Sequence, residues 1–421
     1  MNSNLTIFFL SIIMFFLLAG CHHNEDSNES QIAQIAQIQA YNTYYNYYGQ
    51  NDTLGYKVAM NDEYIITSGV TPDSDSSYYA SCVYVFKRNS GTDIQQIAKL
   101  KPNDNITSEY GNFGTSIAIS GNYILVGSAN RYAPLFGYGG AYLFKINSNS
   151  SITQIAKIQP SDIDAAVNFG ISVAISGDYI VVGANEENSA EYEAGSAYVF
   201  KRNSDTNITQ IAKLYASDIE HGDNFGNAVD IDDTYIVIGA LKEDTTAPNA
   251  GSAYLFKINS DSNVSQIAKL HANDASLNNY FGGSLSIDSD YIAIGAIGDE
   301  NSQSSAYIFK RNSDSNITQV AKLQADNSQE YIAFGYSVSI KNNYIAIGAP
   351  REDTSFVNAG STYVYNISSD GDINNIAKIK ADNSESYDYF GSSVSINDNY
   401  LAIGSTAETA YIFKDASNQN R

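Results

Sequence analysis

Residues 169–214 read FGISVAISGDYIVVGANEENSAEYEAGSAYVFKRNSDTNITQIAKL, and this stretch decides the fold. It holds four apolar runs separated by polar segments. The first run alternates, with Ile171, Val173 and Ile175 on one side, as in a strand with one buried face. The second run, YIVVGA, is apolar nearly throughout and follows after about two residues, which indicates a tight hairpin to a fully buried strand. The unit is therefore predicted to contain four antiparallel strands, named A, B, C and D in chain order.

The same unit recurs seven times along the chain. A Phe-Gly pair stands at 113–114, 169–170, 225–226, 281–282, 334–335 and 390–391, and a degenerate Leu54-Gly55 precedes them. Each copy offers the same four apolar runs, and none contains a helical stretch. Seven units of four antiparallel strands predict an all-β fold, a seven-bladed β-propeller.

The two ends of the repeat region predict how the ring closes. The seventh copy has an A strand (390–396), a B strand (400–404) and a C strand (410–414), but no D strand follows. Residues 30–40, SQIAQIAQIQA, match the D pattern of the other copies. We therefore expect residues 31–40 to form the outer strand of the last blade, which removes a pair of open edges. The propeller then spans residues 31–414, and residues 415–421 form a polar tail.

A targeting segment precedes the repeats. The apolar run from Leu5 to Leu18 is shorter than the about 20 residues of a bilayer span and suits the core of a signal peptide. It ends in Leu18-Ala19-Gly20-Cys21, which resembles the lipobox of bacterial lipoproteins. The resemblance implies a signal peptide over residues 1–20 and lipidation of Cys21, with residues 21–30 as a polar tether. A plain signal peptide or anchor helix with a chance cysteine is the alternative.

The composition and charge of the chain limit the classes of partner that it can bind. The 421 residues carry 23 Lys plus Arg against 46 Asp plus Glu, a formal net charge of −23. This balance excludes nucleic acid and anionic membrane surfaces as partners, because phosphate binding needs clustered cations. The lipid is thus the expected link to the membrane. The residue after Cys21 is His22 rather than Asp, which in a Gram-negative host favours the outer membrane. We expect a monomer.

Several recurring residues are interpreted as scaffold. A tyrosine begins strand B in every copy (Tyr64, Tyr123, Tyr179, Tyr235, Tyr291, Tyr344 and Tyr400), and another lies in strand C (Tyr84, Tyr142, Tyr198, Tyr254, Tyr307, Tyr363 and Tyr411). We expect these to pack within and between blades. A lysine recurs in strand D (Lys99, Lys157, Lys213, Lys269, Lys322 and Lys378), where it is predicted to guard an exposed edge. Cys82 is expected to be a small buried hydrophobic residue in the place where other copies have Ala.

With FG, SVAISGDYIVVGA and GSAYVF, the unit resembles the FG-GAP repeat in its calcium-free bacterial form, whose propeller architecture also occurs in integrin α chains. One copy keeps a literal GAP, Gly348-Ala349-Pro350. Integrin-type blades that bind calcium have a long acidic loop between strands A and B, whereas this chain has short turns such as SGNY, SGDY and DDTY. Such turns are too short to wrap the about six to eight oxygens that Ca²⁺ prefers. We assign no metal and no cofactor.

Strand polarity predicts one variable face. The B–C and D–A loops emerge on one side of the ring, the loop face, and the short A–B and C–D turns on the other, the turn face. The B–C loops vary while the turns repeat, which is typical of a binding surface on a rigid scaffold. Acids and tyrosines gather in these loops, and basic residues are expected toward the outer strands and the turn face.

The favoured hypothesis is a non-catalytic protein that binds a protein or polysaccharide through this acidic, Tyr-rich loop face. The candidate residues are Tyr45, Tyr47, Tyr79, Tyr138, Glu186, Glu187, Tyr192, Glu243, Asp244, Asp299, Glu300, Glu352 and Asp353. The loops alternatively only keep a structural envelope component soluble, or paired acids hold a metal. An enzyme, such as a propeller glycosidase or lyase, is the less favoured alternative. The repeats hold only His221 and His271 and no catalytic motif, so we assign no catalytic residue.

Overall fold

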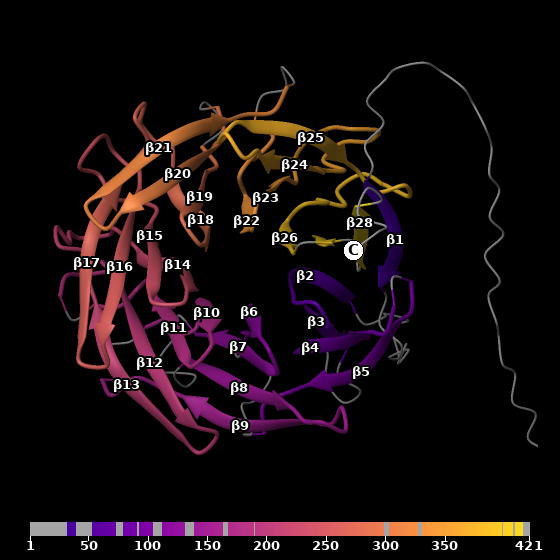
Figure 1. Cartoon of the computed structure of the whole chain (residues 1–421), viewed down its shortest axis with the longest axis horizontal. Helices are drawn as coiled ribbons and strands as arrows, with labels where there is room; N and C mark the ends of the chain where they lie inside the picture. Colours follow the sequence, from indigo (N-terminus) through magenta and orange to yellow (C-terminus); the bar gives the residue numbers. More distant parts are fainter. Residues whose placement is uncertain are drawn as a thin grey trace, which may run out of the picture.

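The computed structural model describes residues 32–38, 53–72, 79–90, 92–103, 112–130, 139–162, 167–188, 190–298, 303–326, 331–397, 399–406 and 409–415. These residues form seven antiparallel sheets of four strands each, arranged in a ring (Figure 1). The prediction of an all-β, seven-bladed propeller is confirmed. The predicted signal peptide, Cys21 and the tether lie outside the described residues, as does the tail after Asp415. None of the described residues belongs to a helix long and apolar enough to span a membrane.

The first four blades follow one another along the chain, each with its A, B, C and D strands in order. Blade 1 contains β2 (Thr53–Met60), β3 (Tyr64–Pro72), β4 (Tyr79–Arg88) and β5 (Ile94–Leu100). Blade 2 contains β6 (Asn112–Ser120), β7 (Tyr123–Ala129), β8 (Gly140–Ile146) and β9 (Ile152–Ile158). Blade 3 contains β10 (Ser172–Ser176), β11 (Tyr179–Ala184), β12 (Ser196–Ser204) and β13 (Asn207–Leu214). Blade 4 contains β14 (Phe225–Asp232), β15 (Tyr235–Ala240), β16 (Ser252–Ser260) and β17 (Asn263–Leu270).

The remaining blades complete the ring. Blade 5 contains β18 (Phe281–Asp288), β19 (Tyr291–Ala296), β20 (Ser305–Ser313) and β21 (Asn316–Leu323). Blade 6 contains β22 (Ser337–Lys341), β23 (Tyr344–Ala349), β24 (Ser361–Ile367) and β25 (Ile373–Ile379). Blade 7 contains β26 (Ser393–Ile396), β27 (Tyr400–Ser405), β28 (Thr409–Asp415) and, as its outer strand, β1 (Ile32–Ile38).

The closure by the N-terminal strand is confirmed. Strand β1 pairs antiparallel with β28, from Ile32 opposite Asp415 to Ile38 opposite Ala410. Figure 1 shows the first strand beside the last, although they are separated by almost the whole chain. Asp415, which was predicted to begin the polar tail, is the last residue of β28.

The hydrophobic core lies between neighbouring blades rather than inside any one of them. One cluster joins Val199 of blade 3 to Phe225, Tyr254 and Phe256 of blade 4. Phe225, from a Phe-Gly pair, meets Tyr254 edge-on with ring centroids 5.5 Å apart. All seven C-strand tyrosines are fully buried, so their predicted packing role is confirmed. Burial of such large side chains supplies most of the favourable free energy of folding.

The inner strands of neighbouring blades are linked by their small polar side chains. Ser172 Oγ donates to the carbonyl of Gly226 at 2.8 Å, and Ser284 Oγ donates to that of Gly335 at 2.7 Å. The glycine of each Phe-Gly pair is needed for this close approach. Gly226 has a φ of +90°, and a Cβ there would lie 2.3 Å from the carbonyl oxygen of Ser196. The alternation of strand A thus reflects apolar packing on one side and inter-blade hydrogen bonds on the other.

The interpretation of Cys82 is corrected in one respect. The register pairs Gly69 with Cys82 in blade 1 and Ala184 with Ser196 in blade 3. Cys82 therefore holds the position of a serine, not of an alanine. It is fully buried, and its thiol lies 3.6 Å from the carbonyl oxygen of Gly69. The expectation that it is a buried residue is confirmed.

Candidate binding face

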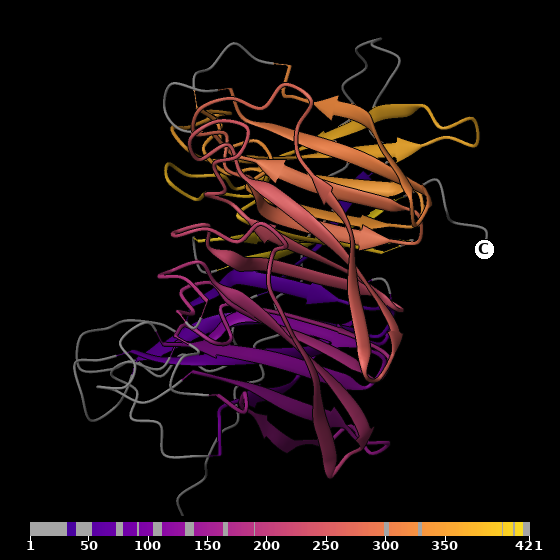
Figure 2. The same cartoon turned by 90° about the vertical axis from the view of Figure 1, so that its left-hand side faces the viewer.

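The loops and the turns lie on opposite sides of the ring. Figure 2 shows the blades from the side, with hairpin turns at the right and loops at the left. The B–C loops of blades 3, 4 and 6 each pair with the D–A loop that enters the next blade. Backbone hydrogen bonds join Gly222 N to Tyr192 O (3.0 Å), Asn278 N to Pro248 O (2.9 Å) and Tyr387 N to Val357 O (2.8 Å). We call each such pair of loops a ridge.

Large apolar side chains are exposed along the ridges. Five of them are between 49 % and 59 % exposed: Tyr192, Leu277, Phe356, Val357 and Tyr387. The ring of Tyr192 stacks on that of His221 from the facing loop, with centroids 5.4 Å apart. The hydrogen bond and the charge of Glu193, with a smaller contribution from the charge of Glu186, raise the pKa of Tyr192. Exposed apolar groups of this kind, gathered at loop tips, are typical of interaction surfaces.

Buried glutamates support the ridges from below. In blades 3, 4 and 6, the third residue after strand B is a glutamate with almost no exposed surface: Glu187, Glu243 and Glu352. Each accepts a hydrogen bond from the lysine of strand D in its own blade. The distances are 3.1 Å from Lys213 to Glu187, 2.9 Å from Lys269 to Glu243 and 2.7 Å from Lys378 to Glu352.

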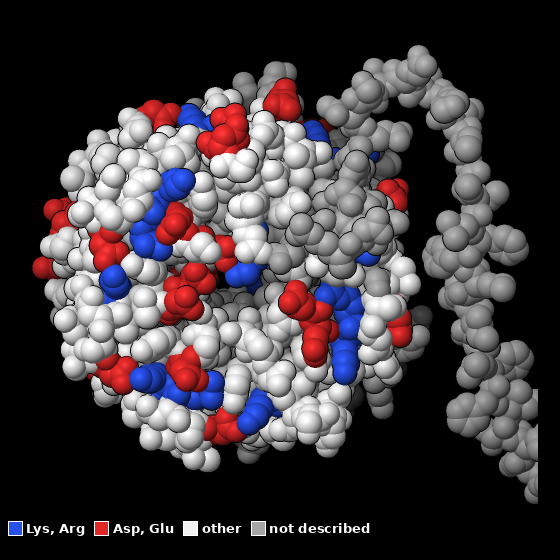
Figure 3. Space-filling view, in the orientation of Figure 1, with Lys and Arg blue, Asp and Glu red and all other residues white. Residues whose placement is uncertain are grey.

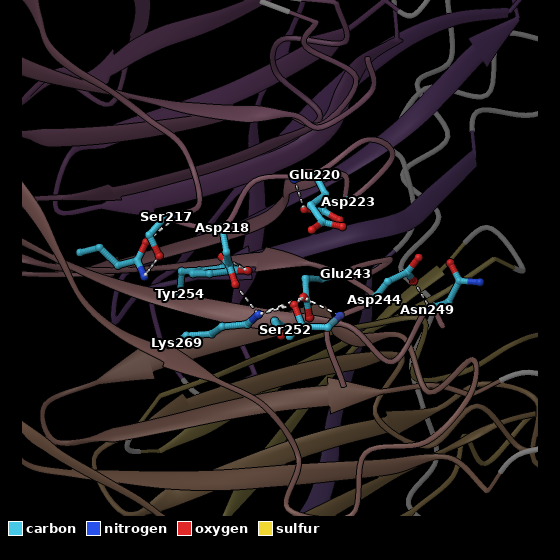
Figure 4. A network of polar contacts seen from close by, with 12 residues as sticks. Ser217, Asp218, Glu220, Asp223, Glu243, Asp244, Asn249, Ser252, Tyr254 and Lys269 are labelled. Atoms are coloured by element: carbon cyan, nitrogen blue, oxygen red, sulfur yellow. Dashed lines mark hydrogen bonds and ion pairs between the residues drawn. The ribbon is translucent and has the colours of Figure 1, made fainter. Parts of the chain in front are cut away.

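The blade 4 network shows how such a glutamate is held (Figure 4). Ser252 Oγ donates to Glu243 Oε2 at 2.7 Å, and the backbone N–H of Thr245 donates to Oε1 at 2.8 Å. Burial alone would raise the pKa of Glu243, but the hydrogen bonds from Thr245, Lys269 and Ser252 lower it overall. Glu243 is therefore a charged anchor for its loop.

The same network extends to the D–A loop that enters blade 4. Lys269 Nζ also contacts Asp218 Oδ2 at 2.5 Å, and Tyr254 Oη donates to Asp218 Oδ1 at 2.9 Å. Burial tends to lower the pKa of Lys269, yet Asp218 and Glu243 raise it above its usual value. One lysine thus ties two loops, which belong to adjacent ridges, to the body of blade 4.

Asp223 is a buried carboxyl that the sequence reasoning did not single out. It is 2 % exposed, and it accepts a hydrogen bond from the backbone N–H of Glu220 at 2.8 Å. Burial, helped by the charges of Glu243 and Glu220, raises the pKa of Asp223 to about 6. The equivalent residue in the next blade is Asn279, whose Oδ1 accepts from Ser276 N at 2.7 Å. An alignment of the repeats places Asp223 opposite Asn279, and this match is the sequence signal that indicates a side chain that accepts a backbone hydrogen bond within the D–A loop.

The structure separates the predicted acid pairs. Glu187, Glu243 and Glu352 are buried in the lysine networks, whereas Asp244 and Asp353 are exposed and Glu186 is half-buried. Asp244 and Asp353 also accept hydrogen bonds from the backbone N–H groups of Asn249 and Asn358. Tyr192 is exposed as predicted. Tyr79 lies in strand β4 rather than in a loop, and Tyr45, Tyr47, Tyr138, Asp299 and Glu300 lie outside the described residues.

The lysines of strand D do not act as simple edge guards. Their ammonium groups lie over the C-strand tyrosine rings, for example Lys269 at 5.7 Å from the centroid of Tyr254. They also face the acids of the loops, so their positive charge lies near the loop face. The strand D lysines thus lie in the outer strands, as expected, but they pair with acids of the loop face and not of the turn face.

The turn face is not purely basic either. Figure 3 shows acidic and basic side chains interspersed around a central hollow on this face. Asp205 pairs with Lys145 at 2.6 Å, and Asp314 pairs with Lys257 at 2.6 Å. The predicted separation of charge between the two faces is therefore wrong for the described residues. Within them, no group of three or more His, Cys, Asp or Glu side chains is arranged to hold a metal ion.

Both the sequence and the fold of the chain resemble those of known proteins. The family described as FG-GAP repeat matches residues 94–144, 152–200, 208–256, 264–309, 317–365 and 373–419. No curated protein matches the chain in sequence. Among solved structures, the chain is similar to the periplasmic gluconolactonase PpgL of Pseudomonas aeruginosa. The two are 10 % identical with a TM-score of 0.51, and the match covers 78 % of this chain and 86 % of that one. At this identity the likeness concerns the fold alone.

Proposed function

The chain belongs to the FG-GAP repeat family, and we propose that it is a non-catalytic binding lipoprotein of the cell envelope. Its loop face takes a protein or polysaccharide ligand. The observation that carries the proposal is the set of exposed apolar side chains on the ridges. Three of them, Tyr192, Phe356 and Val357, lie in loops whose buried glutamates form ion pairs with the lysines of strand D. A surface that only kept the protein soluble would not need exposed apolar side chains at the ends of its loops.

The ridges also supply polar contacts. Exposed Glu220 lies in the loop that faces that of Tyr192, and exposed Asp244 lies in the loop that faces that of Leu277. The chain as a whole is strongly acidic. Aromatic rings beside carboxylates attract cationic or polyhydroxylated groups, because the ring offers contact area and the acids offer charge and hydrogen bonds. A basic protein is therefore the first partner to test, and a polysaccharide the second.

An array of proteins and glycans, probed with residues 22–421, tests the proposal. We expect at least one ligand whose binding weakens between about 50 mM and 500 mM salt. The Tyr192→Ser, Tyr387→Ser double variant should lose at least tenfold in affinity. Val320→Ser is the matched control, because Val320 is also exposed but lies on outer strand β21. Absence of any ligand, or an equal loss in the control, would leave a structural envelope component as the better account.

The proposed location in the cell depends on Cys21, and a separate experiment tests it. We propose that Cys21 carries the lipid and that the protein is anchored to the outer membrane. Cells labelled with a radioactive fatty acid should yield labelled protein from the wild type and none from Cys21→Ser. Label that persists in the variant would contradict the anchor.

Catalysis is not part of the proposal. The buried glutamates of the ridges are already engaged by lysine, and Asp223, whose raised pKa would suit an acid, is buried and bonded to Glu220 N. An assay on lactone and polysaccharide panels tests this point. Turnover by the wild type that Asp223→Asn abolishes would replace the binding protein with an enzyme.

A further inference from the structure

The A strands are the innermost strands of the ring, and they surround the central hollow that Figure 3 shows in the middle of the turn face. In a two-residue hairpin, alternate N–H groups of strand A point away from strand B. At the contact between blades 7 and 1, serines of blade 7 accept these groups from β2. Ser393 Oγ accepts from Val58 N at 3.0 Å, and Ser395 Oγ accepts from Met60 N at 3.1 Å.

Three further contacts between blades repeat the second of these hydrogen bonds. They join blade 4 to blade 5, blade 5 to blade 6 and blade 6 to blade 7. The pairs of acceptor and donor are Asp230 Oδ2 and Ile287 N at 2.8 Å, Ser286 Oγ and Ile340 N at 3.2 Å, and Ser339 Oγ and Ile396 N at 3.1 Å. An inner N–H group at this place in strand A is therefore bonded to the preceding blade over much of the ring.

The contact between blades 1 and 2 departs from this pattern. Alignment on the glycine of the Phe-Gly pair places Lys57 at the position of Ser393 and Ala59 at the position of Ser395. An ammonium group only donates hydrogen bonds, and a methyl group has no polar atom. Blade 1 therefore offers no side-chain acceptor at these two positions to the strand that follows it.

Two backbone donors in β6 are left facing the central hollow as a result. Ile117 and Ile119 hold the positions in β6 that Val58 and Met60 hold in β2. Ser120 pairs with Tyr123 next to the hairpin turn, so the N–H groups of Ile117 and Ile119 point away from β7. Among the described residues, no side chain accepts either group. A donor that the protein does not satisfy favours an acceptor from outside the chain.

Lys57 adds a positive charge beside these donors. Its neighbours Val58 and Met60 are buried in the core, so Lys57 is exposed on the opposite side of β2 or at its inner edge. Burial within the ring nevertheless lowers the pKa of Lys57, and burial is the sole cause of this shift. Both observations fit a side chain in the central hollow, which solvent enters but protein surrounds. Unlike Lys269, whose pKa acids raise, Lys57 has no described acid that compensates its charge.

We propose that the central hollow binds a small monocarboxylate at the contact between blades 1 and 2. The carboxylate would accept hydrogen bonds from Lys57 Nζ and from the N–H groups of Ile117 and Ile119. An ammonium group next to backbone N–H groups is a donor set that suits an oxyanion. One lysine compensates one negative charge, and a chain with a net charge of −23 repels phosphate and acidic polymers more strongly than a monoanion. The site uses inner strands and not the ridges, so it does not depend on ligand binding at the loop face.

Titration of the isotope-labelled protein with sodium D-glucuronate, followed by NMR, tests the site. D-Glucose is the matched neutral probe, and sodium chloride at equal ionic strength controls for salt. Glucuronate should shift the amide resonances of Ile117 and Ile119, and neither control should do so. Lys57→Met should weaken binding about tenfold or more and leave the melting temperature unchanged or higher, because it removes a desolvated charge. Lys380→Met is the control variant, because Lys380 is an exposed lysine of a D–A loop.

A second variant tests the backbone donors. Ala59→Ser rebuilds the acceptor that Ser395 supplies to Met60 N, so it should occupy the N–H group of Ile119. We expect it to weaken glucuronate binding several-fold and to raise the melting temperature.

Several results would overturn the proposal. Equal shifts with glucose or chloride would show that no carboxylate is recognised, and undiminished binding in Lys57→Met would remove the role of its charge. Tighter binding of inorganic phosphate than of glucuronate would contradict the assignment to a monocarboxylate. Absence of any shift with glucuronate would leave the two N–H groups to water. Because Lys57→Met does not alter the ridges, binding to the loop face should persist in this variant, so that each proposal can fail without the other.

Discussion

Asp223 and Asn279 hold equivalent positions in consecutive D–A loops, and each accepts a backbone hydrogen bond from three residues earlier. The two side chains have nearly the same shape, but only Asp223 can ionise. Burial raises its pKa to about 6, above its value in the unfolded chain. Its ionisation in the folded protein therefore opposes folding, while the hydrogen bond that it accepts supports the loop in either case.

The sign of the pH dependence follows from this shift. Between about pH 4 and pH 6 the folded state binds more protons at Asp223 than the unfolded state does, so stability falls as pH rises. Asp223→Asn should match the wild type near pH 4 and exceed it by about 2–3 kcal/mol above pH 6.5. Urea unfolding across this range measures the difference. A gap between the two proteins that does not change with pH would contradict the prediction.

The buried Glu243 depends on Lys269 for its charge compensation. Removing one partner of a buried ion pair leaves an uncompensated charge, so Lys269→Met should lower the free energy of unfolding by about 3 kcal/mol. The double variant Lys269→Met, Glu243→Gln should recover part of this loss. Lys322→Met is the control, because its pair with Asp274 is more exposed and should matter less. Chemical denaturation that ranks the control equal to Lys269→Met would refute the anchor role.

At the scale of elements, strand β1 decides whether the ring is closed. Its loss would expose the edge of β28 and the apolar surface under Ile38, which is 4 % exposed. Deletion of residues 31–40 with Cys21 retained should lower the melting temperature by about 10 °C or more. A synthetic peptide of residues 31–40 should restore the lost stability by strand addition, whereas a scrambled peptide should not. An unchanged melting curve would show that closure contributes little.

The elements could be predicted from the sequence because each copy repeats the same periodicity. Alternation in strand A, the uniformly apolar strand B and the two-residue hairpins are local signals, and seven copies reinforce one another. Whether each acid of the loops is buried or exposed could not be predicted in this way. Hydropathy alone does not distinguish Glu243, which turns inward to Lys269, from Asp244, which stays at the surface. The distinction needed the glutamate at the third position after strand B to be matched with the lysine of strand D.

At the scale of the whole molecule, the core has no independent parts. Each hydrophobic cluster joins strands of two neighbouring blades, as in the cluster that contains Val199 and Phe225. A blade therefore has no complete core of its own. We expect thermal unfolding of the full propeller to be a single transition, with calorimetric and van't Hoff enthalpies that agree. Separate transitions for parts of the ring would contradict this view of the packing.

The pairing of Ile32 with Asp415 makes the two ends of the described chain neighbours in one ladder. A short peptide link between these ends would make the polypeptide circular without moving a strand. New termini could then be opened at another C–D turn, for example between Ser260 and Asn263 of blade 4, which occupies the equivalent place in its own sheet. The ring itself therefore does not require the chain to start at β1. A circularly permuted protein should therefore fold to the same ring.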